Sequence, residues 1–151
     1  MKAKQLTIEL VQGDTFSKTI KVYAQSNLEY RGKFSTAYAY QTNDVVLYQN
    51  VVYYSKSDAN KANLPTNTTY WGTLTPVNLT GATIVAKFEE QKSDTASNFT
   101  VTITDAVNGV FTIGLTSVQT QALSFNMANY DISINGTTYI FGNLLLHKEI
   151  V

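Results

Sequence analysis

Residues 99–115 read FTVTITDAVNGVFTIGL, and this stretch decides the fold. Apolar side chains alternate with threonines before Asn108-Gly109, and with Thr112 and Gly114 after it. Alternation with a period of two is typical of a strand with one buried face, and Asn-Gly tolerates the positive φ angles of a tight hairpin turn. The stretch therefore predicts two antiparallel strands joined by a hairpin.

The same alternation recurs along most of the chain. It is present in residues 6–10, 19–23, 84–88 and 130–134, and a second Asn-Gly pair stands at 135–136. Residues 116–123 look helical instead, with Ser117 placed to cap one or two turns. About seven short antiparallel strands separated by turns predict an all-β protein built as a β-sandwich.

The apolar end of the chain, residues 144–151, has two interpretations. It is either the last strand of the sandwich, or a segment that pairs with a neighbouring subunit by adding to a sheet edge.

The pattern changes between residues 28 and 76, where tyrosines are frequent and the single tryptophan occurs. The flanks, with two strands before and about five after, read as one sandwich. We therefore expect residues 1–27 and 77–151 to form a discontinuous sandwich and residues 28–76 to form an inserted unit. Such an insertion is tolerated when its two ends lie close together at a loop.

The inserted segment has a recognisable spacing of aromatic and turn residues. The residues that carry it are Tyr40, Asp44, Val46, Tyr48, Tyr53, Pro65 and Trp71. This pattern resembles the small chitin- and cellulose-binding modules of the family 5/12 type, with Asn43 and Asn50 where that family usually has glycines. The spacing itself predicts two short strands around a Gln49-Asn50 turn, covered by Trp71, in a three-stranded aromatic-rich β unit.

In modules of that family, exposed aromatic side chains stack on sugar rings. The resemblance therefore implies contact residues for a glycan or a protein at Tyr38, Tyr54, Tyr70 and Trp71. Core packing is the expected role of Tyr40, Tyr48, Tyr53 and, in the competing interpretation, of Trp71 itself.

The flanks carry a second resemblance, in short motifs at the strand ends. These are residues 12–16 (QGDTF), 79–83 (LTGAT), 107–111 (VNGVF), 128–132 (ANYDI) and 141–144 (FGNL). They resemble the immunoglobulin-like N-terminal domain of phage baseplate upper proteins. The resemblance implies an immunoglobulin-like sandwich and a place in a virion.

Composition limits the partners. Charged residues make up 15% of the chain and the net charge is zero, so the surface consists mainly of hydroxyl and amide groups, which suit assembly contacts or neutral glycans. The sequence has no basic stripe for nucleic acid and no apolar run of about 18 residues for membrane insertion. It also lacks cysteine and an apolar leader, which is compatible with folding in a reducing cytoplasm.

Catalysis and metal binding are not expected. His147 is the one histidine, and Glu89 and Glu90 are adjacent in a strand, so their side chains point to opposite faces and cannot flank one bond. Four aspartates near turns lack the spacing of a calcium loop: Asp14, Asp44, Asp58 and Asp105. For Asp44 we expect hydrogen bonds to the amides of a turn. We therefore predict no catalytic residue, no metal and no cofactor.

Taken together, the two resemblances imply a bacteriophage virion structural protein. It would be a tail or baseplate component, or a head decoration or adaptor, that docks through its sandwich and displays the inserted unit. The expected partners are other phage structural proteins and further copies of the chain, in a virion assembled in the host cytoplasm. The alternative is a carbohydrate-binding adhesion module that recognises host surface glycans, and a glycan-active enzyme is a third hypothesis.

Overall fold

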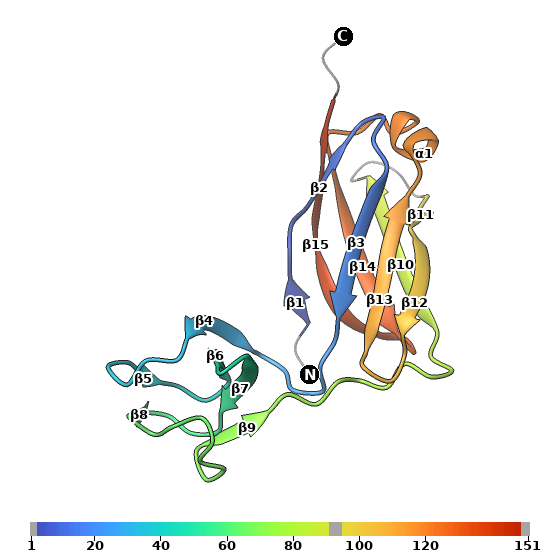
Figure 1. The fold of residues 1–151 in the computed structure, drawn as a ribbon. Helices are drawn as coiled ribbons and strands as arrows, with labels where there is room; N and C mark the ends of the chain where they lie inside the picture. Colours follow the sequence, from blue (N-terminus) through green and yellow to red (C-terminus); the bar gives the residue numbers. More distant parts are fainter. Residues whose placement is uncertain (1–2, 91–94, 149–151) are drawn as a thin grey trace. The chain divides into compact units, whose positions relative to one another are not determined.

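The computed structural model describes residues 3–90 and 95–148, which form two compact units (Figure 1). One unit is Tyr23–Pro76, and the other consists of the flanking segments that end at Val22 and resume at Val77. The sequence pattern predicts the first boundary between residues 27 and 28 instead. The difference arises because Tyr23 pairs with Pro76, and the Ala24 amide donates to the Thr75 carbonyl at 2.8 Å.

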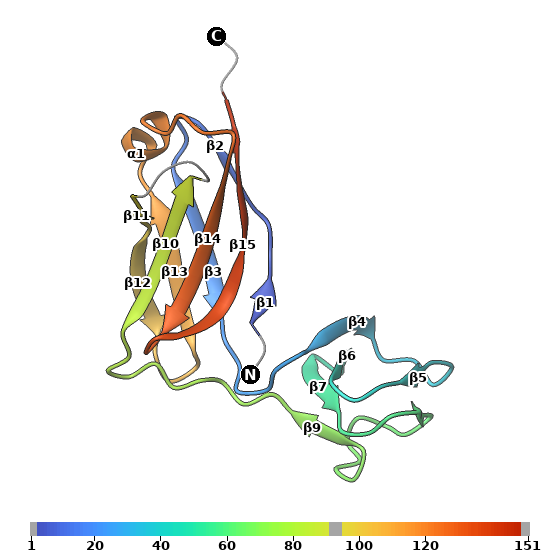
Figure 2. The ribbon, with the colours of Figure 1, turned by 180° about the vertical axis from the view of Figure 1, so that it is seen from behind.

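The flanking segments form an all-β sandwich, as predicted. The larger sheet has the strand order β1–β15–β14–β10–β11, with β2 also paired to β15, and it faces the viewer in Figure 2. Its strands are β1 (Lys4–Gln5), β2 (Ile8–Val11), β10 (Ile84–Glu90), β11 (Ser97–Asn98), β14 (Met127–Ile134) and β15 (Thr137–His147). The smaller sheet has the order β12–β13–β3. Its strands are β3 (Phe16–Lys21), β12 (Thr100–Asp105) and β13 (Val110–Leu115).

The core of the sandwich is built from alternate residues of these strands. In β13, Phe111, Ile113 and Leu115 are buried, and in β14 every second residue from Ala128 to Ile134 is buried. Burial on one face of each strand is the result that a period of two requires.

Strand β12 departs from its predicted pattern. Phe99 is buried just before it, but Val101 is half-buried and Ile103 is 38% exposed. β12 is the edge strand of the three-stranded sheet, and its register with β13 shifts between Ile103 and Asp105. A bulge at an edge turns the strand away from the core, which explains the exposed isoleucine.

The first strands of the chain pair in parallel with its last strand, although the alternation predicts antiparallel strands throughout. β1 and β2 both run parallel to β15, on the same side of it, and β14 pairs with the other side. The last strand is therefore flanked on both sides, so Leu144–His147 offer no open edge to a neighbouring subunit. Residues 149–151 of the predicted strand lie outside the described residues.

Leu6 lies between β1 and β2 and is held tightly against β15. Its amide donates to the Phe141 carbonyl at 2.9 Å, and its carbonyl accepts the Tyr130 hydroxyl. A Cβ atom at Gly142 would lie 2.1 Å from the Leu6 carbonyl oxygen, so this close approach requires glycine.

The predicted helix is present as α1 (Ser117–Gln121), but Thr116 caps it rather than Ser117. The Thr116 side chain accepts from the Gln119 amide at 3.2 Å, and the Gln119 side chain accepts from the Thr116 amide at 2.8 Å. This is a capping box, in which two amides without helical partners are satisfied together.

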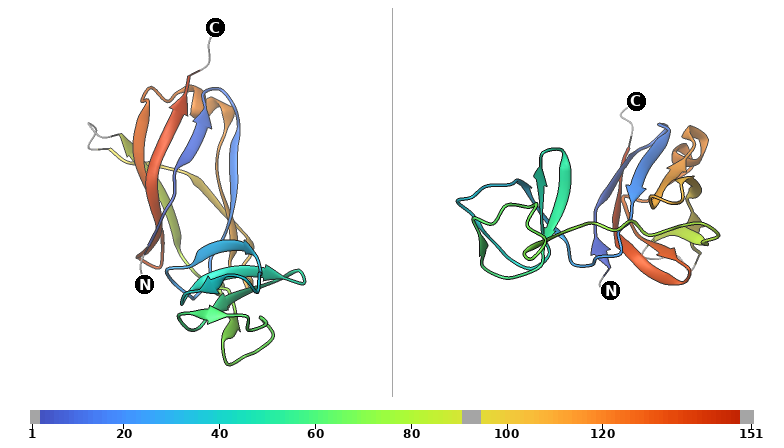
Figure 3. Two further views of the ribbon diagram at one scale, coloured as in Figure 1. Left: turned by 90° about the vertical axis from the view of Figure 1, so that its left-hand side faces the viewer. Right: turned by 60° about the horizontal axis from the view of Figure 1, so that its bottom comes forward.

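The inserted unit contains more strands than the three that were predicted. A four-stranded sheet has the order β4–β6–β7–β9, and a separate pair joins β5 to β8. Figure 3 shows this unit in blue-green to light green from two further sides. The strands are β4 (Glu29–Lys33), β5 (Ala39–Tyr40), β6 (Asp44–Tyr48), β7 (Val51–Ser55), β8 (Asn60–Lys61) and β9 (Trp71–Thr73). β4 lacks apolar alternation and joins the sheet by parallel pairing with β6.

Asparagines make the predicted tight turns in both units. Gln49 and Asn50, between β6 and β7, have φ angles of 49° and 63°, and Asn135 and Gly136, between β14 and β15, have 50° and 83°. Both are two-residue hairpins with positive φ at each position. At Asn108-Gly109 the glycine has a positive φ of 69° and the asparagine does not.

The inserted unit has a hydrophobic core of its own. Tyr40, Val46 and Trp71 are buried there, and Phe34 and Tyr53 pack against them. Ile8 and Ile132 belong to the separate core of the sandwich.

Candidate binding site on the inserted unit

A shallow pocket of about 450 Å³ lies on the inserted unit. One short stretch of chain supplies its lining: Arg31, Lys33, Ser35, Ala37, Tyr38 and Tyr40. β4 ends here after a bulge, because its register with β6 shifts between Tyr30 and Lys33 and Gly32 has a φ of 87°. The loop from β4 to β5 then completes the wall.

Tyr38 is the predicted contact residue that lines this pocket. Its side chain is 46% exposed, and its ring lies 4.8 Å from the ring of Tyr40, at an interplanar angle of 54°. Tyr40 is fixed in turn, because its hydroxyl accepts from the Ser35 amide at 2.9 Å and its ring contacts Trp71. The core thus positions an aromatic ring that remains open to solvent.

Trp71 was predicted as a possible contact residue, and the structure corrects this. It is 1% exposed, and its indole nitrogen donates to the Asn63 carbonyl at 2.9 Å. Edge-on contacts with Phe34 and Tyr40 enclose the ring. A side chain in this position stabilises the unit and presents no face for a ligand to stack on.

Tyr54 and Tyr70 do not line the pocket. Tyr54 is half-buried, because its ring lies over its cross-strand partner Gly72, where a Cβ atom would be 2.6 Å from the ring. Tyr70 is 36% exposed, and its carbonyl accepts from the Lys56 amide and from the Asn60 side chain. The structure therefore separates Tyr38 from the other predicted contact residues.

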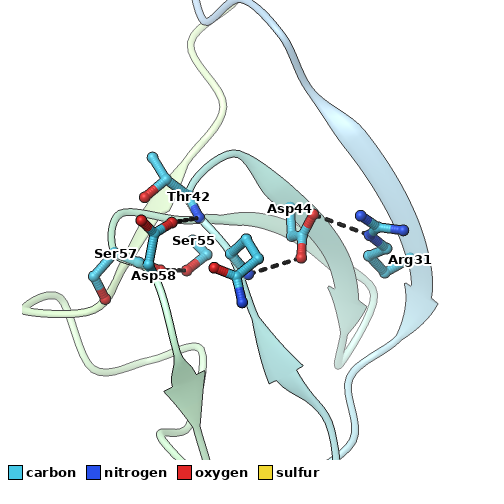
Figure 4. Close-up of polar contacts among 7 residues, drawn as sticks. Arg31, Thr42, Asp44, Ser55, Ser57 and Asp58 are labelled. Carbon is cyan, nitrogen blue, oxygen red and sulfur yellow. Dashed lines mark hydrogen bonds and ion pairs between the residues drawn. The ribbon is translucent and has the colours of Figure 1, made fainter.

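A buried carboxylate holds the basic side of the pocket in place. Asp44 is 2% exposed, and its Oδ1 accepts from Arg31 Nε at 2.9 Å, while its Oδ2 accepts from the Gln41 amide at 2.8 Å (Figure 4). The hydrogen bond to Asp44 raises the pKa of Arg31 above its usual value. The hydrogen bond to the Gln41 amide is the turn contact that the sequence predicts for Asp44.

The loop that follows β7 is ordered by polar side chains. Ser55 and Asn60 are buried, and the Asn60 side-chain amide donates a hydrogen bond to the Ser55 hydroxyl at 3.0 Å. The Asn63 side chain donates to the Asn60 side-chain oxygen at 2.9 Å. Asp58 accepts from the Thr42 amide at 3.0 Å, which lowers the pKa of this carboxyl (Figure 4). Where the structure is described, every buried side-chain nitrogen and oxygen has a hydrogen-bond partner.

Arg31, Lys33 and Ser35 were not among the residues that the sequence pattern indicated. The available signal was the sequence Arg31-Gly32-Lys33, which places two cations around a glycine in a chain with 11 basic residues. The Arg31 guanidinium is paired with Asp44 through Nε. Within residues 3–90 and 95–148, no other side chain engages its two terminal nitrogens or the Lys33 ammonium.

The other residues that the sequence raised as candidates are the acidic side chains and His147. In the described part of the chain, no three His, Asp or Glu side chains are grouped so that they could hold a metal ion. His147 lies 3.8 Å from Glu9, with both side chains exposed. The helices of the described residues are also too short or too polar to cross a membrane.

Comparisons with known proteins do not add a family. No protein-family model matches the chain, and no curated protein matches it significantly.

Proposed function

We propose that the chain is a structural protein of a bacteriophage virion that docks through its β-sandwich and displays the inserted unit. It acts as a tail or baseplate component, or as a head decoration or adaptor, in many copies and beside other phage structural proteins. The proposal rests on the resemblances of the flanks and of the insertion, and on one structural observation.

That observation is the separate folding of the inserted unit. It has its own buried core, and its two ends are paired with each other, through Tyr23 and Pro76 and through Ala24 and Thr75. On the sandwich side, the Val77 amide donates to the Val22 carbonyl at 3.0 Å. A unit attached by two adjacent chain segments can be displayed without its ligand contacts depending on the packing of the sandwich.

Electron microscopy of purified particles tests this proposal directly. Antibodies against the chain are expected to label intact virions of the phage that encodes it, at a regular position on the head or tail. Mass spectrometry of the same particles is expected to find the chain at a stoichiometry that matches a symmetric structure. Absence of the chain from purified particles, with its presence in the soluble lysate, would reject the virion role.

A second function, glycan binding, is favoured by the exposed ring of Tyr38 beside a pocket. Many copies on one particle would let each contact be weak, because avidity compensates for low single-site affinity. Calorimetry of the full chain with saccharides tests it. No heat with any neutral or acidic saccharide would leave the docking role as the remaining proposal.

A further inference from the structure

The pocket at Tyr38 has a charge character that the resemblance to chitin- and cellulose-binding modules does not imply. The charged side chains that line it are Arg31 and Lys33, both cations. Asp44, which neutralises part of the Arg31 charge, is buried and does not line the pocket. Glu29 is near enough to act electrostatically on Arg31 but is likewise not part of the lining.

Arg31 is held in a fixed orientation. Its Nε donates to Asp44, and Asp44 is fixed by the Gln41 amide on its other oxygen. The terminal nitrogens Nη1 and Nη2 remain for a ligand, and a guanidinium presents them in a fork that matches the two oxygens of a carboxylate. Because the side chain is already oriented, less conformational entropy is lost on binding.

Lys33 and Ser35 add two further donors. Lys33 is exposed, and no described residue accepts a hydrogen bond from its ammonium group. The Ser35 hydroxyl oxygen accepts from the Ala37 amide at 3.2 Å, which leaves its hydrogen for another acceptor. The pocket thus combines donors for an anion with a donor for a neutral oxygen.

Tyr38 supplies the apolar surface. Its ring is 46% exposed and is held by contact with Tyr40. An ordered aromatic face of this kind suits the C–H face of a sugar ring. The cavity volume of about 450 Å³ falls in the range of about 300–1,000 Å³ that is typical of small-molecule sites.

We propose that this pocket binds a sugar residue that carries a carboxylate, as in a uronic acid-containing glycan. The carboxylate pairs with Arg31 and Lys33, Ser35 bonds a ring or hydroxyl oxygen, and the sugar ring stacks on Tyr38. The inference rests on the second proposed function, glycan binding, and does not depend on the place of the protein in a virion.

The test uses a ligand pair that differs in charge. Calorimetry of the full chain is performed with trisaccharides of galacturonate, glucuronate and mannuronate, and with their methyl esters, which keep the sugar and remove the charge. At least one acid form is expected to bind, and its methyl ester to bind about tenfold more weakly, as loss of one charged hydrogen bond predicts. Binding of the acid form is also expected to weaken as salt is raised.

Two matched pairs of variants locate the site. Lys33→Gln is expected to weaken binding of the acid form about fivefold to tenfold, whereas Lys87→Gln on the sandwich leaves it unchanged. Tyr38→Ala is expected to weaken binding about tenfold or more, whereas Tyr30→Ala, at a more exposed tyrosine outside the pocket lining, leaves it unchanged. Arg31 is left intact because its removal would leave Asp44 buried without its cation.

The outcomes separate the two proposals. Equal affinity for acid and ester, or equal effects of Lys33→Gln and Lys87→Gln, would overturn the carboxylate site and leave glycan binding standing. Failure of all six trisaccharides, together with failure of neutral chito- and cello-oligosaccharides, would overturn both. The virion role would be affected by neither result.

Discussion

The two units of the chain are stabilised in different ways. The sandwich buries mainly aliphatic and phenylalanine side chains, together with Tyr130, and both of its sheets contribute to this core. Thr120 is its one buried residue with a short polar side chain among those described. The inserted unit encloses Tyr40, Val46 and Trp71, together with the buried polar residues Asp44, Ser55 and Asn60. A unit of this size has too little interior for an aliphatic core, so large aromatic rings and satisfied polar groups provide the order instead.

This difference has a consequence for function. Buried polar groups that are fully hydrogen-bonded favour one conformation. In the inserted unit one of them, Asp44, bonds a residue that lines the pocket. Asp44 joins the interior of the unit to Arg31, and Tyr40 joins Trp71 to Tyr38. The residues that order the small unit therefore also position its candidate binding surface.

The largest expected effect comes from Trp71→Ala. Loss of a fully buried tryptophan costs about 3–5 kcal/mol, more than a unit of this size is expected to tolerate. Hydrogen exchange with mass spectrometry should show loss of protection in peptides from residues 23–76, while peptides from the sandwich remain protected. Tyr30→Ala, at a side chain that is 62% exposed, is the matched control. Loss of protection in both units together would show that they unfold as one.

A smaller effect is expected from Asp44→Asn. The amide can accept from Arg31 or from the Gln41 amide, but its NH₂ group then faces the other donor, which costs about 1–3 kcal/mol. The loss should again be confined to hydrogen exchange in the inserted unit. Glu29→Gln, an exposed carboxylate on the neighbouring strand, is expected to change stability by about 0.5 kcal/mol or less. Equal effects of the two substitutions would contradict the stabilising role of the two Asp44 hydrogen bonds.

Much of the sandwich was predictable from the sequence, and the reason is local. In β13 and β14 the side-chain period and the buried face coincide, because both strands pack against the core along their whole length. The parallel pairing of β2 with β15 was not predictable, because alternation shows which face is buried and not which strand is the neighbour. β4 was missed for a different reason, because most of its residues are exposed and its sequence has no apolar alternation.

The candidate site was predicted in part. Tyr38 was predicted as a contact residue because exposed aromatic side chains in modules of the resembled family stack on sugar rings, and the structure places it, exposed, in the pocket lining. Exposure itself depends on the tertiary fold, so the sequence left Trp71 with two interpretations, contact residue or core residue, and its 1% exposure places it in the core. Arg31 and Lys33 line one pocket because β4 has a bulge and because Asp44 holds Arg31 in place. Neither the bulge nor the Asp44 contact can be predicted from the composition of the chain.

Tyr130 is a buried, hydrogen-bonded side chain of the sandwich, as Asp44 is of the inserted unit. Burial raises the pKa of its hydroxyl from 10.0 to about 12, and the neutral hydroxyl donates to the Leu6 carbonyl. Since the folded-state pKa is the higher one, this contribution to stability is complete below pH 10 and is lost as the pH rises through about 12. Absorbance of tyrosinate should show a late-titrating group that Tyr130→Phe removes. The same substitution should cost about 1 kcal/mol, and Tyr139→Phe should cost less. A titration unchanged by Tyr130→Phe would contradict this assignment.

Effects of similar size are expected from the two hairpin turns, one in each unit. At Asn50, with a φ of 63°, alanine is expected to cost about 1 kcal/mol because its Cβ disfavours the left-handed conformation, whereas Asn50→Gly should be neutral or slightly stabilising. Asn135 has a similar φ of 50°, but its side chain also accepts from the Thr83 amide at 2.9 Å. Asn135→Ala should therefore destabilise the sandwich more than Asn50→Ala destabilises the inserted unit, and Asn135→Gly should remain destabilising. Hydrogen exchange in each unit measures the stability change caused by the alanine and glycine substitutions at each turn. Equal changes at the two turns would mean that the Asn135–Thr83 hydrogen bond contributes no stability beyond the backbone geometry.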